Sequence, residues 1–212
     1  MLKSGDIPRL KKQNTTSFSG HLTDNLQVLI TTIEAEDFYT RQHSQRVTQI
    51  SIEIVKAMSC FQEDIDILSF VCSLHDIGKI GINDSILLKP GPLSSEEFET
   101  IKTHPIIGTD IVKPLDLPPL EMAVIRNHHE RWDGNGYPDK LKGEEIPLLT
   151  RIVAVADAFD VMVFNRPYSK AMEYSEALDE IMRCKGTQFD PEVVNYFEIC
   201  LEKIWNKKFI FE

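Results

Sequence analysis

The sequence carries little positive charge. Its 23 Lys and Arg residues stand against 33 Asp and Glu residues, which gives a net charge of −10 at pH 7. Proteins that bind long nucleic acids need a basic surface, so this composition argues against a nucleic-acid partner. A small phosphate ester remains a candidate ligand, because bound metal ions can supply the positive charge that such a ligand needs.

Long apolar runs and closely spaced cysteine pairs are also absent. No run reaches the length of a membrane span, and residues 1–5 do not begin a signal peptide. The cysteines are too far apart for a zinc finger or for the disulfide pattern of a secreted protein, and we expect free thiols at Cys60, Cys72, Cys184 and Cys200. We therefore expect a cytoplasmic protein with no membrane segment.

The alternation of apolar and polar residues that marks a half-buried β-strand is missing as well. Apolar residues instead recur every three or four positions in 43–60 and again in 64–74, which predicts amphipathic helices. A capping box at 94–97 and first-turn prolines support further helices, which we expect at 118–127, 148–162, 174–184 and 190–205. The longest predicted loop is 128–145.

These patterns predict an all-α fold, in which a site is built between facing helices. At 212 residues the chain is long enough to bury a substantial core as a single domain. Residues 1–20 are polar and predict a flexible leader or the remnant of a linker, so the domain is expected to span 21–212.

An adjacent His and Asp interrupt an otherwise apolar run at 74–79. Burying the ionisable pair His75-Asp76 costs free energy unless the pair is partnered or binds a cation. The run predicts a helix that ends near Gly78, with a core-facing side made of Val71, Leu74 and Ile77. A lone His-Asp pair is also typical of a surface turn. The interpretation as a metal site therefore depends on the other histidines of the chain.

Five of the six histidines lie in contexts that suit metal binding, whereas His21 lies in the polar leader. Two six-coordinate ions offer twelve positions. A shared Asp76 would fill two of them, and one each would be filled by His43, His75, His104, His128, His129 and Asp157. The positions left for water and substrate are typical of an open catalytic site. Imidazole and carboxylate ligands suit iron, manganese, zinc or nickel.

Two ordered motifs carry a resemblance to a known family. They are His-Asp-Ile-Gly-Lys at 75–79 and His-His-Glu-Arg-Trp-Asp-Gly-Asn-Gly-Tyr-Pro at 128–138. The sequence resembles the HD-GYP family of cyclic di-GMP phosphodiesterases, which lies within the larger group of HD-domain phosphohydrolases. The similarity extends from about Thr40 to Val194 and includes the segments 88–93, 104–108, 157–160 and 186–191. The resemblance implies an HD-domain helical bundle with a dinuclear metal site between helices.

The resemblance also implies seven metal ligands, each at a matching family position. One ion would be bound by His43, His75 and Asp157, and the other by His104, His128 and His129, with Asp76 as the bridge. Some family members hold a third metal through a Glu four residues before the first His, where this chain has Tyr39. We therefore predict two divalent transition-metal ions, with iron or manganese preferred and zinc or nickel as alternatives.

For the substrate, the resemblance assigns three contacts. Lys79 would contact the scissile phosphate or the bridging hydroxide, Tyr137 would line the nucleotide pocket, and Arg166 would contact guanine or phosphate. Ser169 stands where many relatives have a second basic residue, so a guanine preference is less firmly implied than hydrolysis.

Three further acids have two interpretations each. Asp160 lies one turn from Asp157 and either orients a ligand histidine or has a structural role. Glu130 and Asp133 either do the same or anchor the loop that they belong to.

The predicted function is metal-dependent hydrolysis of cyclic di-GMP to linear pGpG, with a second cut at the same site giving GMP, as in the family. One alternative is hydrolysis of another cyclic dinucleotide or of a nucleotide. A second is a receptor that binds cyclic di-GMP without cutting it, against which the open ligand set argues. The Gly-Tyr-Pro loop could also bind a protein partner, for example a diguanylate cyclase domain.

Overall fold

The computed structural model describes residues 38–164 and 171–206, and the side chains of 42–164 and 171–204. The predicted leader at 1–20 lies outside the described residues. The same holds for Arg166, Ser169 and the side chain of Tyr39.

The described chain is built of helices, and no strand occurs within 38–164 or 171–206. The predicted all-α fold is therefore confirmed. In chain order the helices are α2 (Phe38–Ala57), α3 (Gln62–Val71), η1 (Ile77–Gly81), α4 (Asp84–Leu87), α5 (Ser95–Ile101), α6 (His104–Val112), η2 (Lys113–Leu115), α7 (Pro119–Asn127), η3 (Gly143–Glu145), α8 (Leu148–Val163), α9 (Tyr174–Arg183) and α10 (Pro191–Asn206).

Local sequence signals explain several of these boundaries. Ser94 caps α5, because its hydroxyl oxygen accepts the backbone N–H of Glu97 at 3.2 Å and the Glu97 carboxylate accepts the Ser94 N–H at 2.6 Å. Helices α7, α8, α9 and α10 lie within one or two residues of the predicted positions. The four cysteines are free thiols, as predicted.

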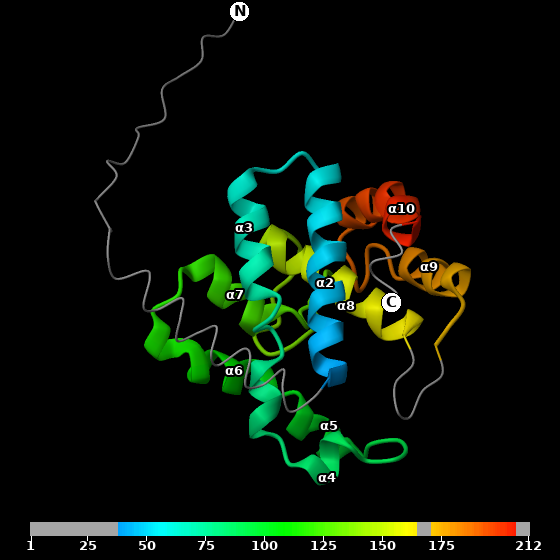
Figure 1. Ribbon diagram of the computed structural model, residues 1–212. Coiled ribbons are helices and arrows are strands. Elements are labelled where there is room, and N and C mark those ends of the chain that lie inside the picture. The colour runs from blue at the N-terminus through cyan, green and yellow to red at the C-terminus, as the bar shows by residue number, and fades with distance from the viewer. Residues whose placement is uncertain (1–37, 165–170, 207–212) are drawn as a thin grey trace, which may run out of the picture.

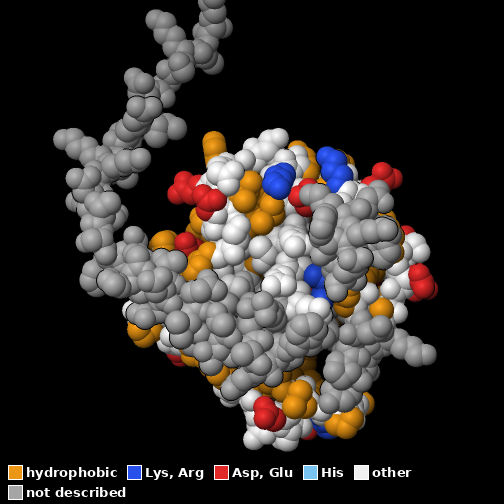
Figure 2. Space-filling model, in the orientation of Figure 1, with side chains coloured by type: hydrophobic (Ala, Val, Ile, Leu, Met, Phe, Trp, Pro, Cys, Tyr) orange, Lys and Arg blue, Asp and Glu red, His pale blue; other side chains and the backbone are white. Residues whose placement is uncertain are grey.

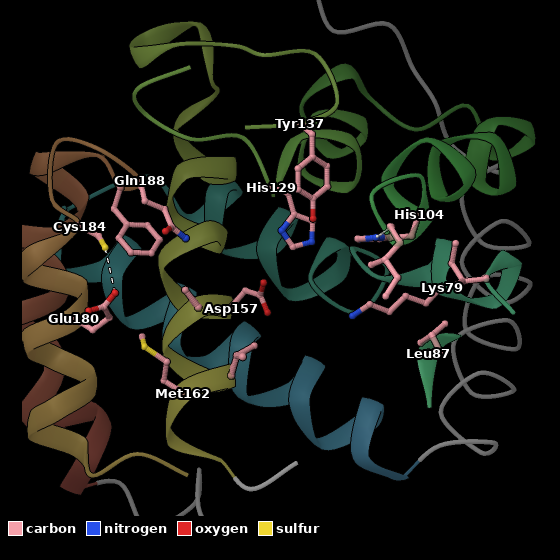
Figure 3. A pocket seen from close by; sticks show the side chains of 15 residues that line it. Lys79, Leu87, His104, His129, Tyr137, Asp157, Met162, Glu180, Cys184 and Gln188 are labelled. Atoms are coloured by element: carbon pink, nitrogen blue, oxygen red, sulfur yellow. Dashed lines mark hydrogen bonds between the residues drawn. The ribbon is translucent and has the colours of Figure 1, made fainter. Parts of the chain in front are cut away.

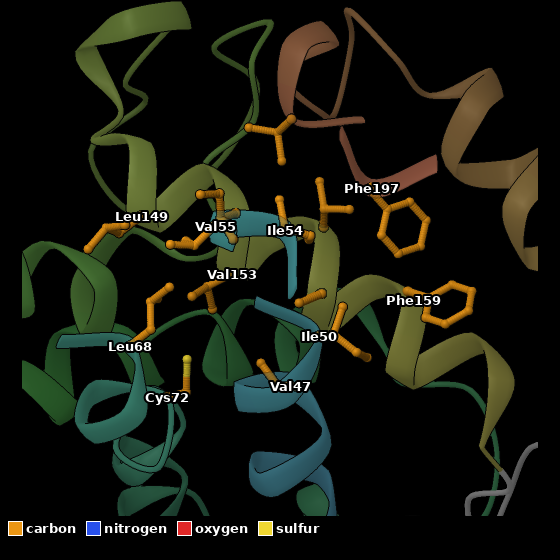
Figure 4. Packing of buried hydrophobic residues seen from close by; sticks show 14 of the residues in the cluster. Val47, Ile50, Ile54, Val55, Leu68, Cys72, Leu149, Val153, Phe159 and Phe197 are labelled. Atoms are coloured by element: carbon orange, nitrogen blue, oxygen red, sulfur yellow. The ribbon is translucent and has the colours of Figure 1, made fainter. Parts of the chain in front are cut away.

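Helix α2 runs through the middle of the molecule, with α3 and α7 on one side and α9 and α10 on the other (Figure 1). It packs against α8, α10 and α3. In the core shown in Figure 4, three residues of α2 are fully buried with one aromatic residue each from α8 and α10: Val47, Ile50, Ile54, Phe159 and Phe197. Burying such a side chain contributes about 1.5–3 kcal/mol. This packing fixes α2 against α8, and both helices carry predicted ligands.

The distribution of positive charge on the surface agrees with the acidic composition of the sequence. On the face shown in Figure 2, the visible Lys and Arg side chains are separated from one another and do not gather in one patch. None of the described helices combines the length and the apolar character needed to cross a membrane.

The segment around His75 differs from the prediction. Helix α3 ends at Val71 and a turn connects it to η1, so the expected helix reaching Gly78 was wrong. The N–H of Leu74 donates to the Val71 carbonyl at 2.9 Å and that of Ile77 donates to the Leu74 carbonyl at 3.0 Å, which is the tighter i to i−3 pattern. The apolar residues still face the core as predicted. The tighter turn is what brings this segment against α6.

The contact between η1 and α6 is a contact between two backbones. A Cβ atom at Gly78 would lie 1.8 Å from the His104 carbonyl oxygen and 2.5 Å from the Gly108 nitrogen. Only glycine fits this approach. The contact therefore sets how closely the turn carrying Asp76 lies to the first residue of α6, His104.

We predict that Gly78→Ala lowers the free energy of unfolding by about 3 kcal/mol or more, because the backbone of α6 cannot move aside as a side chain can. Gly81→Ala is the matched control in the same 3₁₀ helix, since its added Cβ would meet only side-chain atoms of Ile107, the nearest at 2.8 Å. Chemical denaturation of both variants measures the difference. Equal destabilisation by the two substitutions would contradict the proposed backbone contact.

Candidate dinuclear metal centre

The structure brings together all seven side chains that the sequence predicts as metal ligands. They form two groups, in each of which the candidate ligand atoms lie within 4.8 Å of one another. One group consists of His43, His75 and Asp157, and the other of Asp76, His104, His128 and His129. They come from α2, the turn before η1, the start of α6, the two residues that follow α7, and α8. This grouping has the same composition as the predicted partition.

Asp76 belongs to the second group, but its carboxylate also faces the histidines of the first. Its Oδ2 is 3.8 Å from Nε2 of His43 and 3.5 Å from Nε2 of His75. Its Oδ1 is 3.3 Å from Nε2 of His104 and 3.8 Å from Nε2 of His128. Each carboxylate oxygen thus faces a different group, which is the arrangement of a carboxylate that bridges two cations.

The rings of three histidines are held by hydrogen bonds to the backbone. Nδ1–H of His75, His104 and His128 donates to the carbonyl oxygen three residues earlier, at 2.6, 2.7 and 3.0 Å. A carbonyl oxygen can only accept, so Nδ1 carries the hydrogen and Nε2 carries a lone pair in the neutral ring. All three Nε2 atoms are therefore prepared to act as ligands.

The donor set fits a cation. Nε2 of His75 is buried and has no hydrogen-bond partner within the part of the chain that the structure describes. Nε2 of His104 and Nε2 of His128 lie only 3.2 Å apart, although each carries a lone pair in this tautomer. Burial lowers the pKa values of His75 and His128 and lowers the pKa of His129 to about 4, so these rings are neutral near pH 7. Buried lone pairs that face one another are stabilised when a divalent cation lies between them.

His43 is oriented by a charged pair behind it. Its Nδ1 lies 2.6 Å from Oδ2 of the fully buried Asp160. Arg46 donates to the same carboxylate through Nε at 2.5 Å and Nη2 at 3.0 Å, and its guanidinium lies 3.7 Å from the ring centre of Phe164. Burial acts to lower the pKa of His43, but the carboxylates of Asp157 and Asp160 raise it to about 9. A metal ion bound at Nε2 of His43 would take the place of a proton there, because a histidine ligand binds through a deprotonated nitrogen.

Arg46 is the residue of this centre that sequence reasoning missed. It lies one turn after His43 on α2 and is only 7% exposed. Its signal in the sequence was a basic residue three positions after a candidate ligand, on a helix face that is otherwise apolar. Of the two interpretations of Asp160, the structure favours orientation of a ligand histidine.

The other two acids anchor the loop. Oε1 of Glu130 accepts the backbone N–H of Asp139 at 2.6 Å. The Asp133 carboxylate accepts from Arg131 at 2.9 and 3.2 Å and from the backbone of Asn135 at 2.9 Å. These bonds hold the long loop before η3 in one conformation. Within the described residues, neither acid has a hydrogen bond to a predicted ligand.

A cavity of about 500 Å³ opens beside the centre (Figure 3). It is lined by Lys79, His104, His129, Tyr137 and Asp157, among others. The Lys79 ammonium is paired with Oδ2 of Asp76, and although burial opposes it, this charge holds the pKa of the Asp76 carboxyl well below its usual range. The Tyr137 ring is stacked on His129 with 4.9 Å between the ring centres. The volume is typical of a small-molecule site.

Comparison with known proteins places the chain in a family. A family model described as an HD domain matches residues 27–193. The chain is 44% identical over 190 residues to a protein of Thermotoga maritima named cyclic di-GMP phosphodiesterase, and the alignment covers 89% of this chain and 51% of that protein. The chain thus spans about half the length of this relative.

Two solved structures show the same fold. A Vibrio cholerae phosphodiesterase described as specific for cyclic GMP-AMP matches with a TM-score of 0.65 and 23% identity, covering 90% of this chain and 51% of that one. A protein of Bdellovibrio bacteriovorus described as an HDG"Y"P protein matches with a TM-score of 0.65 and 21% identity, covering 87% of this chain and 60% of that one. The predicted HD-domain bundle is thereby confirmed. With an HD domain model over most of its length, a His-Asp pair at 75–76 and a Gly-Tyr-Pro turn at 136–138, the chain belongs to the HD domain family and to its HD-GYP group.

Proposed function

We propose that the protein is a metal-dependent phosphodiesterase that hydrolyses cyclic di-GMP to linear pGpG, with GMP as the product of a second cut. The position of Asp76 carries this proposal, because each of its oxygens faces a different group of imidazole ligands beside a cavity. The name of the Thermotoga maritima relative, which is 44% identical, supports the same reaction and substrate.

The ligands of the proposed centre are the seven residues of the two groups. His43, His75 and Asp157 would hold one divalent ion and His104, His128 and His129 the other, with Asp76 shared. When bound, the two ions supply the charge that activates water and stabilises the phosphoryl group during cleavage. Mixed imidazole and carboxylate ligands suit iron or manganese, with zinc and nickel as alternatives.

The remaining roles belong to residues of the cavity wall. The Lys79 ammonium lies beside Asp76 and would stabilise negative charge on the scissile phosphate. Tyr137, stacked on His129, would form one wall for the nucleotide. The contact assigned to Arg166 and a protein partner at the Gly-Tyr-Pro loop stay predictions.

The first experiment is anaerobic purification of the protein, metal quantification, and turnover assays with iron or manganese supplied. We expect two ions per chain. We also expect conversion of cyclic di-GMP to pGpG, which chromatography of the reaction mixture detects. Cyclic GMP-AMP belongs in the same assay, because a structural neighbour is described as specific for it. Three tightly bound ions per chain would contradict the two-metal assignment, and a metal-loaded protein without turnover would contradict the proposed reaction.

Asp76→Ala is expected to lose metal and turnover together, because it removes the only carboxylate that faces both groups of the described site. Asp66→Ala, which removes an exposed carboxylate on α3, is the control and should keep both properties. Metal content by mass spectrometry and initial rates measure the outcome. Wild-type activity in Asp76→Ala would contradict the assignment of Asp76 as the residue that bridges the two ions.

Asp160→Asn is expected to weaken the binding of one ion by about 10- to 100-fold and to leave the other unchanged. The physical reason is that only His43 is oriented by the Asp160 carboxylate, whereas three of the other rings are held by backbone carbonyls. Titration of the metal-free protein by calorimetry measures both affinities. Asp179→Asn, at an exposed site on α9, is the matched control. Equal weakening of the two ions would contradict this role of Asp160.

A further inference from the structure

Gln188 lies at the end of the cavity away from Lys79, in the loop between α9 and α10 (Figure 3). A second cavity of about 350 Å³ adjoins the first, and Gln188 lines both of them. His129, Tyr137 and Phe189 also line both cavities. Gln188 is therefore part of the wall that a ligand of the metal centre would contact on this side.

The Gln188 amide has only one allowed orientation. Nη1 of Arg131 donates to Oε1 of Gln188 at 2.9 Å. A guanidinium has donors and no acceptor, so the amide oxygen must face Arg131 and the amide NH₂ must face the other way. Arg131 is itself held by the Asp133 carboxylate.

The backbone around the amide is also fixed. The N–H of Trp132 donates to the Gln188 carbonyl at 3.0 Å, and the N–H of Gln188 donates to the Cys184 carbonyl at 3.0 Å. Gln188 is therefore held both by the loop after α7, through Arg131 and Trp132, and by the end of α9, through Cys184. Its orientation exists before any ligand binds, which reduces the entropy lost on binding.

Nε2 of Gln188 has no acceptor among the described residues, although Oε1 of the same amide is paired. A half-buried donor that faces a cavity forms its hydrogen bond with water or with a ligand. A ligand that offers an acceptor at this point gains affinity, and a ligand that offers a donor there leaves both groups unpaired.

The chemistry of the two ends of the cavity indicates which ligand atom this is. Asp76 and Lys79 lie at the end where the scissile phosphate would bind. On the Gln188 side the cavity is lined by the polar residues Cys184 and Glu180 and by Phe189 and Met162, whose apolar side chains suit the flat face of a base. The acceptor at this end is therefore expected on a base.

The fixed orientation distinguishes the two purines. Guanine presents the acceptors O6 and N7 on one edge, whereas adenine presents N7 and the donor N6. A glutamine reads adenine with its oxygen and nitrogen together, but in this protein the oxygen of Gln188 is already paired with Arg131. The group left to face a base is the Nε2 donor. N7 accepts a hydrogen bond in both purines, so the discrimination lies at position 6, where guanine offers the acceptor O6 and adenine offers the donor N6.

We propose that Gln188 determines base specificity by donating a hydrogen bond from Nε2 to O6 of a guanine bound beside Phe189. This inference rests on the proposed function, since it assigns one base of the cyclic dinucleotide to this end of the cavity. It also gives this chain a source of guanine preference, although Ser169 stands where many relatives have a second basic residue.

The test compares kcat/KM for cyclic di-GMP and for cyclic di-AMP in the metal-loaded full chain. Gln188→Leu removes the donor and should lower the ratio of the two values by about tenfold. Gln188→Glu can pair one oxygen with Arg131 and offer the other as an acceptor, so it should lower the ratio further. Gln62→Glu makes the same chemical change at an exposed position of α3 and should leave the ratio unchanged.

Metal content and thermal melting of each variant show whether the centre is intact. An unchanged ratio in Gln188→Leu and Gln188→Glu, with wild-type metal content, would overturn the inference and leave the proposed function standing. If the wild-type chain turns over no cyclic dinucleotide, the proposed function fails, and calorimetric binding of the same two ligands decides the inference. A guanine preference that is lost in Gln188→Leu would then support it, and equal or absent binding would overturn it.

Discussion

The site depends on the balance of charge around one buried carboxylate. Asp76 is 8% exposed and lies among imidazole rings, where an ionised group is costly unless positive charge is close. Lys79 supplies one such charge, but burial keeps His75, His128 and His129 neutral, so these rings offer lone pairs instead of charge. Both oxygens of the carboxylate and the lone pairs of the rings converge on two positions. Carboxylate oxygens and imidazole lone pairs in this arrangement are suited to holding metal ions.

The fold holds the two groups of ligands by different means. The rings of His75, His104 and His128 depend on backbone carbonyls within their own turns, so their orientation is set locally. His43 depends instead on Asp160, which lies 117 residues away in the sequence. A carboxylate partner makes an imidazole more basic than a carbonyl partner does. The group that contains His43 should therefore bind its ion more tightly, and its geometry depends on the packing of α2 against α8.

Much of the fold and most of the centre followed from local patterns. First-turn prolines, caps and apolar spacing together predict α7, α8, α9 and α10 to within a residue or two. The helix expected to reach Gly78 was wrong, since the close approach of two backbones there requires a turn that no local signal encodes. Arg46 was missed for a related reason: its partner Asp160 lies 114 residues away. The orientation of Gln188 likewise depends on Arg131, at a separation of 57 residues.

The sequence by itself determined the class of fold, the family and the set of candidate ligands, because helix periodicity, caps and motif spacing are properties of neighbouring residues. Tertiary structure decided which oxygen of Asp76 faces which histidines, which carboxylate orients His43, and which atom of Gln188 faces the cavity. These are questions of direction between side chains from distant segments. Hydrogen bonds are directional and fall off within a fraction of an ångström, so only the packed arrangement of the helices answers them.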